Sequence, residues 1–230
     1  MTEASPVTYT LQNAVAHIHM DDGKANAMSA RMLQALRAAF ERAQGDGAVV
    51  LLSGRERFFS GGYDLAMFSR TPEEITRTLR AGAELVERMA SFPFPVVAAC
   101  TGHGIAQGAF TLLAADERIG AAGPFKLGLN EVAIGMTIPH YGVELARMRL
   151  SPPWFNHATL TGTLYDPEQA QQAGFLDFVC APADVLERAR AAAERLTKLD
   201  MKAHAATKQR VRGPALAKLR EGIEQELRVG

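Results

Sequence analysis

Apolar residues in the first half of the chain follow two patterns that are typical of β-strands. Residues 7–11 and 14–20 alternate between apolar and polar positions and contain β-branched and aromatic side chains. Because successive side chains of a strand point to opposite faces of a sheet, this alternation predicts two half-buried strands, and the two polar residues between them predict a β-hairpin. Residues 48–52 and 95–100 are instead almost continuously apolar, as expected for strands buried on both faces.

Helix start signals lie between these strands. Ser29 can cap a helix that extends to about residue 43. Thr71, Pro72 and Glu74 form a stronger start, because they supply an N-cap, a proline at the first helical position and the closing residue of a capping box. The helix that they begin extends to about residue 92. The remaining expected elements are a helix over residues 108–115, a strand region from Ile119 and a helix that begins at Asp166-Pro167.

Strands and helices therefore alternate through about residue 180, which predicts an α/β fold with largely parallel strands. The last fifty residues show no strand pattern. Helices are expected over residues 182–199, 201–212 and 214–227, with Gly213-Pro214 separating the last two. The predicted organisation is a core over residues 1–180 followed by a helical region over residues 181–230.

Composition narrows the class of protein. The 230 residues suffice for one compact domain with a small appendage, and the formal net charge of zero argues against binding of nucleic acid or of an anionic membrane surface. The N-terminus lacks a basic flank followed by an apolar stretch, and prolines and glycines interrupt the nearly uncharged segment 91–115. We therefore expect a cytoplasmic protein without a membrane span. Cys100 and Cys180 lie in apolar segments and predict buried thiols rather than a disulfide.

Three segments place glycine or a carboxylate in apolar surroundings. Residues 102–108 follow a strand and open a helix, but Gln107 stands where a dinucleotide fingerprint requires its third glycine. A plain tight turn and a turn that aims backbone N–H groups at an oxyanion both remain open there. Residues 58–65 contain paired glycines, for which a hairpin-like turn is the simpler interpretation when the segment is taken alone. Glu131 lies among apolar residues and is either functional or paired in a salt bridge.

Taken together, four segments resemble the crotonase superfamily of enoyl-CoA hydratases and isomerases in order and spacing. They are residues 21–28, 59–65, 95–104 leading to Asp116, and 128–132. The resemblance covers about residues 10–210. It implies a crotonase-like spiral of β-β-α units, a C-terminal α-helical trimerisation region and assembly into a homotrimer or hexamer. It also implies an acyl-CoA thioester as substrate, with no metal and no cofactor apart from the coenzyme A that the substrate carries.

The resemblance assigns the chemistry to particular residues. The backbone N–H groups of Tyr63 and Gln107 match the donors that hold the thioester oxygen and stabilise an enolate. Hydratases of the family use two glutamates; Glu131 matches the second, but Phe110 occupies the position of the first, six residues before Asp116. Phenylalanine can neither hold a water nor move a proton. The sequence therefore favours an enoyl-CoA isomerase, in which Glu131 alone moves a proton from C2 to C4. The residues just before Glu131 also resemble the mitochondrial-type Δ3,Δ2-enoyl-CoA isomerases.

Two other functions remain open. The first is an enoyl-CoA hydratase in which Glu131 acts alone or with an unrecognised partner such as His140. The second is a non-catalytic acyl-CoA binding protein that has kept the fold after losing one carboxylate. Measuring the turnover of enoyl-CoA substrates distinguishes the three functions: an isomerase moves the double bond, a hydratase adds water to it, and a binding protein leaves the substrate unchanged.

The resemblance also predicts substrate contacts. Lys24, Ala25 and Asn26 match the loop that meets the nucleotide part of coenzyme A; for Lys24 a solvated surface lysine is the alternative. Lys208 matches a C-terminal lysine that can contact coenzyme A. The remaining predicted substrate-binding residues are Gly61, Gly62, Asp64, Phe110 and His140. For Asp64 a role in stabilising its own turn, and for His140 and Tyr141 ordinary packing at a helix start, are the alternatives. His17 and His19 share one strand face but have no third metal ligand nearby, so packed histidines are expected.

Overall fold

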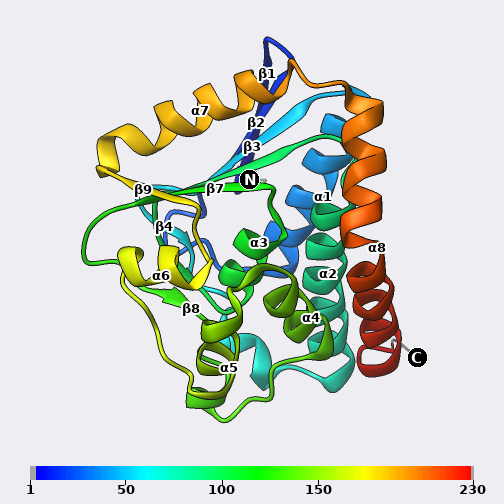
Figure 1. The fold of residues 1–230 in the computed structure, drawn as a ribbon. Coiled ribbons are helices and arrows are strands. Elements are labelled where there is room, and N and C mark those ends of the chain that lie inside the picture. Colours follow the sequence, from blue (N-terminus) through cyan, green and yellow to red (C-terminus); the bar gives the residue numbers. More distant parts are fainter. Residues whose placement is uncertain (1–3, 229–230) are drawn as a thin grey trace.

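The computed structural model describes residues 4–228, which form two β-sheets surrounded by helices (Figure 1). The larger sheet has the order β1-β2-β3-β5-β7-β9 and is parallel except for the β1–β2 hairpin. The smaller sheet, β4-β6-β8, is parallel throughout. The strands are β1 (Val7–Gln12), β2 (Val15–Met20), β3 (Val49–Ser53), β4 (Arg57–Ser60), β5 (Val96–Cys100), β6 (Gly102–Ile105), β7 (Glu117–Ala121), β8 (Leu127–Gly128) and β9 (Phe178–Cys180).

Helices cover both faces of the larger sheet. The α-helices are α1 (Ala30–Gly45), α2 (Pro72–Ser91), α3 (Gln107–Ala114), α4 (His140–Arg149), α5 (Pro152–Leu160), α6 (Pro167–Ala173), α7 (Val185–Leu196) and α8 (Met201–Glu226). Three short 3₁₀-helices are η1 (Leu65–Ser69), η2 (Val132–Ile134) and η3 (Pro182–Asp184). Figure 1 shows α7 crossing the larger sheet on one side, while α1, α2 and α3 lie on the other.

The chain repeats one connection. In the unit β3-β4-α2 the first strand joins the larger sheet, the second joins the smaller sheet, and a helix follows; β5-β6-α3 repeats the pattern. This arrangement confirms the expected spiral of β-β-α units with helices at the C-terminus. Because β4 and β6 are hydrogen-bonded neighbours, the turns that follow them lie side by side.

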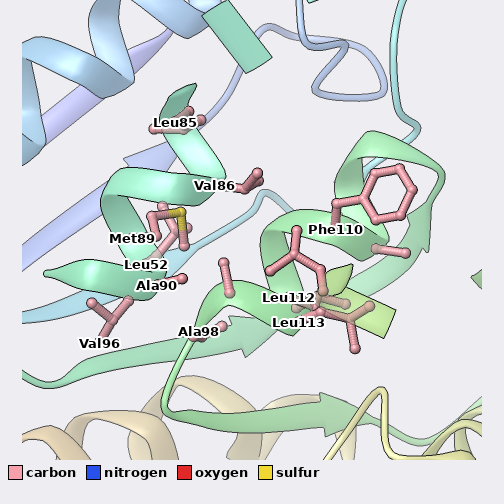
Figure 2. Packing of buried hydrophobic residues seen from close by; sticks show 14 of the residues in the cluster. Leu52, Leu85, Val86, Met89, Ala90, Val96, Ala98, Phe110, Leu112 and Leu113 are labelled. Atoms are coloured by element: carbon pink, nitrogen blue, oxygen red, sulfur yellow. The ribbon is translucent and has the colours of Figure 1, made fainter. Parts of the chain in front are cut away.

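Apolar side chains fill the spaces between these layers. One cluster lies between the larger sheet and helices α1–α4, and a smaller one lies beneath α7. Figure 2 shows part of the first cluster, to which Met89 of α2, Leu112 of α3 and the strand residue Ala98 all belong. Val185 and Ala189 of α7 are buried against the larger sheet, so the helical region after residue 180 packs directly on the core formed by the residues before it.

Local sequence signals place several elements correctly. The hairpin turns at Asn13 and Ala14, whose φ values of 52° and 59° are those that a two-residue hairpin turn requires. Ser29 accepts a hydrogen bond from the N–H of Met32 at the start of α1. Both hydrogen bonds of the capping box at Thr71 and Glu74 are formed at the start of α2.

The helices expected on either side of Gly213-Pro214 are a single helix, so the predicted break is wrong. Helix α8 extends from Met201 to Glu226 with Pro214 inside it. A proline within a helix costs about 3 kcal/mol, because a hydrogen bond is lost and its ring clashes with the preceding turn. Packing offsets this cost, since Leu216, Leu219 and Ile223 are buried against the rest of the chain.

Buried ion pairs also fix α8. Asp116 accepts hydrogen bonds from Lys208 Nζ at 2.6 Å and from the N–H of Val96 at 2.8 Å, and it pairs with Arg212 at 2.9 Å. The side chains of Lys208 and Arg212 are only 5% and 7% exposed. Lys208 also donates to the carbonyls of Phe92 and Phe94. The predicted contact of Lys208 with coenzyme A is therefore wrong, because its ammonium group holds the helix in place.

Candidate active site

The turns after β4 and β6 bring Tyr63 and Gln107 together. Gly62 has a φ of +86°, and a Cβ placed on it would lie 2.9 Å from the carbonyl oxygen of Ile105 and 3.6 Å from the nitrogen of Gln107. No residue with a side chain fits this approach without displacing backbone. Gly62, which the sequence predicts to be a substrate-binding residue, thus allows Tyr63 and Gln107, the two predicted donor residues, to lie close together.

The surrounding hydrogen bonds occupy the other polar groups of the first turn. The N–H of Gly61 donates to the carbonyl of Ala25, the N–H of Gly62 donates to Ser60 Oγ, and the carbonyl of Gly62 accepts from Met28. Ser60 Oγ in turn donates to the carbonyl of Asn26, which makes Ser60 a fully buried turn residue rather than a nucleophile. Within residues 4–228 the N–H of Tyr63 donates no hydrogen bond.

The second donor begins a helix. Gln107 is the first residue of α3, where N–H groups have no partner in the preceding turn, and within the described part of the chain its N–H is unpaired. Ala106 precedes it with a φ of 52° and a ψ of −118°, a conformation that costs a residue with a side chain about 1–3 kcal/mol. The two free N–H groups and the positive end of the helix dipole create a site suited to a developing negative charge.

Glu131 and Tyr63 both line a pocket of about 130 Å³, which Ala106 also lines. Glu131 ends the segment after β8, at the start of η2, and the residue is 6% exposed. Its Oε2 atom has no hydrogen-bond partner among the described residues. Burial raises the pKa of the Glu131 carboxyl from 4.5 to about 7, and a hydrogen bond from its own backbone N–H opposes this shift. A carboxyl group with this pKa and a free oxygen can take up and release protons near neutral pH.

Phe110 and Tyr141 form an apolar wall of the pocket. Their rings make an edge-to-face contact with centroids 5.6 Å apart, and Phe110 is 2% exposed. A Cβ on Gly142 would lie 2.5 Å from the Phe110 ring, so the glycine makes room for that ring. Figure 2 shows Phe110 pointing away from Leu112 and Leu113 on the same helix. The predicted position of Phe110 at the substrate pocket is consistent with the structure. The side chains lining the pocket are mostly apolar; besides Phe110 they are Leu65, Phe68, Leu79, Ile134, Met136 and Pro139.

Two predicted substrate contacts are wrong for the side chains concerned. Asn26 is fully buried; its amide donates to the carbonyls of Met20, Phe58 and Phe59 and its oxygen accepts from Asp22. His140 lies outside the pocket, with its backbone N–H donating to Glu226 and its ring 68% exposed. Adjacent residues of a helix point about 100° apart, so Tyr141 faces the pocket while His140 faces α8.

The remaining predicted contacts surround the first turn. Residues 22–27 fold around the Asp22 carboxylate, which accepts from the N–H groups of Lys24, Asn26 and Ala27. This fold leaves Lys24 exposed and puts Ala25 next to Gly61, and a coenzyme A contact by Lys24 and Ala25 stays a prediction. Asp64 is exposed and caps η1 by accepting from the N–H of Ala66, which supports the alternative of a turn-stabilising role.

The pocket also contains polar groups that sequence reasoning did not assign. Asn130 Oδ1 is buried without a partner among the described residues, and the hydroxyl of Tyr141 donates to Gln107 Oε1 at 2.9 Å. The sequence offered one hint, since Tyr141 follows Ile138-Pro139, where the family pattern places the acyl pocket.

Elsewhere, His17 and His19 both form hydrogen bonds with Ser53 Oγ, as expected for packed strand histidines. Within residues 4–228 we find no helix long and apolar enough to cross a membrane, and no cluster of three His, Cys, Asp or Glu residues placed to hold a metal ion.

The spiral of β-β-α units is that of the crotonase class. A family model described as enoyl-CoA hydratase/isomerase matches residues 10–229. The chain therefore belongs to the enoyl-CoA hydratase/isomerase family, whose members act on acyl-CoA substrates.

Individual relatives carry different names. An enoyl-CoA hydratase/isomerase family protein of Pseudomonas syringae is 44% identical, covers 96% of each chain and superposes with a TM-score of 0.94. A structure described as an enoyl-CoA isomerase of Mycobacterium tuberculosis is 43% identical, again with 96% of each chain covered, and has a TM-score of 0.92. A second structure from Mycobacterium tuberculosis is described as a probable enoyl-CoA hydratase; it is 44% identical over 95% of this chain and 93% of its own, with a TM-score of 0.92. A putative enoyl-CoA hydratase of Thermus thermophilus is 32% identical over 77% of this chain and 72% of its own length.

Proposed function

We propose that the protein is an enoyl-CoA isomerase that converts a 3-enoyl-CoA into the conjugated 2-enoyl-CoA. The carboxylate of Glu131 removes a proton from C2, and the electron pair of the broken C–H bond moves into a dienolate whose charge rests on the thioester oxygen. The N–H groups of Tyr63 and Gln107 stabilise that oxygen. The protonated Glu131 then returns the proton to C4, so that no water and no cofactor besides the substrate's own coenzyme A is required.

The observation that carries this proposal is the solitary carboxylate. Glu131 lies in a pocket that contains no second carboxylate among its lining residues, and Phe110 occupies the position where the hydratase pattern has one. One carboxyl group suffices to move a proton between two carbons of the same molecule, whereas the hydratase pattern uses two to hold and activate water. The apolar wall disfavours water in the pocket.

The direct test is turnover of a 3-enoyl-CoA. We expect the absorbance of the conjugated thioester to appear when 3-hexenoyl-CoA is added to the protein. Unchanged 3-hexenoyl-CoA after prolonged incubation, together with demonstrated binding, would support the non-catalytic acyl-CoA binding protein instead.

Hydration is the second candidate, and the name of the Thermus relative favours it. It predicts loss of conjugated absorbance from crotonyl-CoA as water adds across the double bond. Under our proposal this loss is much slower than isomerisation of 3-hexenoyl-CoA. The reverse order of rates would identify a hydratase. His140 offers no second acid group for that reaction, because it contacts Glu226 outside the pocket.

The pH dependence tests the role of Glu131 as a base. Since burial raises its pKa to about 7, Glu131 is protonated and inactive as a base below that pH. We expect kcat/KM to rise about tenfold per pH unit up to about pH 7 and then to level off. Initial rates between pH 5.5 and 9 would measure this profile. A plateau that already begins near the ordinary carboxyl pKa of 4.5 would contradict the buried base.

Assembly into a homotrimer or hexamer also remains a proposal. It rests on the family resemblance, and light scattering coupled to size-exclusion chromatography would measure the mass.

A further inference from the structure

The two residues that supply the oxyanion donors are also connected through their side chains. Gln107 Nε2 donates to the carbonyl of Gly82 at 2.8 Å, and Gln107 Oε1 accepts from the Tyr141 hydroxyl at 2.9 Å. The Tyr63 hydroxyl donates to the carbonyl of Leu79 at 3.3 Å. Leu79 and Gly82 belong to the same turn of α2, so this turn anchors both donor residues.

Tyr141 links this network to the wall of the pocket. Its hydroxyl donates to Gln107 Oε1, and its aromatic ring makes an edge-to-face contact with Phe110. We call the hydrogen-bonded set of Leu79, Gly82, Tyr63, Tyr141 and Gln107 the tyrosine circuit.

The packing of the circuit leaves little freedom. A Cβ on Gly82 would lie 1.9 Å from the Tyr63 hydroxyl oxygen and 3.1 Å from Gln107 Nε2. Both residues are buried: Gln107 is 0% exposed and Tyr141 is 1% exposed. Buried hydrogen bonds of this kind fix side chains in one geometry, because no water is present to replace a lost partner.

We infer that Tyr141 is a positioning residue, whose hydroxyl holds Gln107 so that its backbone N–H points at the thioester oxygen. The inference rests on the proposed enolate chemistry, but it concerns how the carbonyl is polarised and can be measured without turnover. Tyr141 acts through Gln107 and takes no proton itself. Burial raises the pKa of the Tyr141 hydroxyl, and the neighbouring Tyr63 and Glu131 raise it further, so the group remains a neutral donor.

The test replaces Tyr141 by Phe, which removes the hydroxyl and keeps the ring that packs on Phe110. Butanoyl-CoA labelled with ¹³C at its thioester carbonyl serves as a saturated, unreactive probe. Hydrogen bonds from the donors lower its carbonyl stretching frequency, which infrared difference spectroscopy measures. We expect Tyr141→Phe to return this frequency part of the way to the value of the free thioester. The kcat for 3-hexenoyl-CoA should fall about tenfold with KM within a factor of two, a smaller loss than the 10²–10³-fold expected when a donor is removed outright.

Two further variants make the result specific. Tyr165→Phe is the matched control, because Tyr165 is equally buried and its hydroxyl bonds to His157, outside the pocket; it should change neither frequency nor kcat. Gln107→Met keeps the backbone N–H but removes the side-chain hydrogen bonds. Since the bond that Tyr141→Phe breaks is also lost in Gln107→Met, the double variant should lose little more than Gln107→Met alone.

The outcomes separate the two proposals. A low carbonyl frequency in the wild-type protein that rises in Tyr141→Phe supports the inference even if no 3-enoyl-CoA is isomerised, and the proposed function alone then fails. An unchanged frequency in Tyr141→Phe overturns the inference, whatever happens to kcat.

Discussion

Replacing Glu131 by Gln is expected to abolish isomerisation while acyl-CoA still binds. The amide has nearly the shape of the carboxyl group but cannot accept a proton from C2. Loss of a general base of this kind lowers kcat by roughly 10²–10⁴-fold. Because the proposed oxyanion donors are the backbone N–H groups of Tyr63 and Gln107, the substitution should leave the hydrogen bonds to the thioester oxygen unchanged. The measurement is kcat with 3-hexenoyl-CoA beside the Kd of butanoyl-CoA.

The control for this variant is Glu117→Gln, since Glu117 pairs with Arg195 away from the pocket and should leave kcat unchanged. Stability provides a second control. The folded-state pKa of Glu131 is raised from 4.5 to about 7, so ionising it destabilises the fold as pH rises through this window. Glu131→Gln should therefore match the wild type in urea unfolding below pH 4.5 and exceed it by up to about 3 kcal/mol above pH 7. A variant that keeps full activity would remove Glu131 from the mechanism.

Replacing Asp116 by Asn is expected to be the most destabilising of the substitutions considered. It leaves the ammonium group of Lys208 and the guanidinium group of Arg212 buried without a counter-charge. Removing one partner of a buried ion pair costs about 3–5 kcal/mol. The free energy of unfolding from urea titration would show this loss, and α8 is the element that should separate first.

An exposed ion pair supplies the comparison. Glu41 pairs with Arg37, and the two side chains are 49% and 69% exposed. Glu41→Gln should cost only about 0.5 kcal/mol, because water screens the pair. If Asp116→Asn lost no more than Glu41→Gln, the contacts of α8 with α2 and α4, rather than the buried charges, would hold the helix.

The sequence predicts the parts of the fold that depend on near neighbours. The capping box at Thr71 and the Ser29 cap involve residues three positions apart, so α1 and α2 begin where expected. The sequence predicts a glycine-rich turn where strand β6 lies, because Gly102 and Gly104 have low strand propensity and the pairing of β6 with β4 and β8 depends on distant segments. Helix α8 continues through Pro214 for the same reason, since its packing partners are distant in the sequence.

The candidate site shows the same division. The choice of Tyr63, Gln107 and Glu131 follows from motifs whose residues are close in sequence. The structure brings the turns of Tyr63 and Gln107 into contact, and Tyr63 and Glu131 line one pocket. The roles of Asn26 and Lys208 could not be predicted, because their hydrogen bonds reach carbonyl groups up to 116 positions away. A sequence alone does not distinguish a polar residue that contacts a ligand from one nearby whose hydrogen bonds stabilise the surrounding loops.

The predicted donors and the predicted base come from three separate segments of the chain. Tyr63 and Gln107 follow β4 and β6 of the smaller sheet, and Glu131 follows β8, the third strand of that sheet, just before the exposed Val132 and Ile134. Under the proposed function, side chains in the exposed part of this segment can be changed without altering the strands that position Tyr63 and Gln107. For enzyme engineering, we therefore expect residues 132–135 to be the place to introduce new acid or base groups while thioester binding is kept.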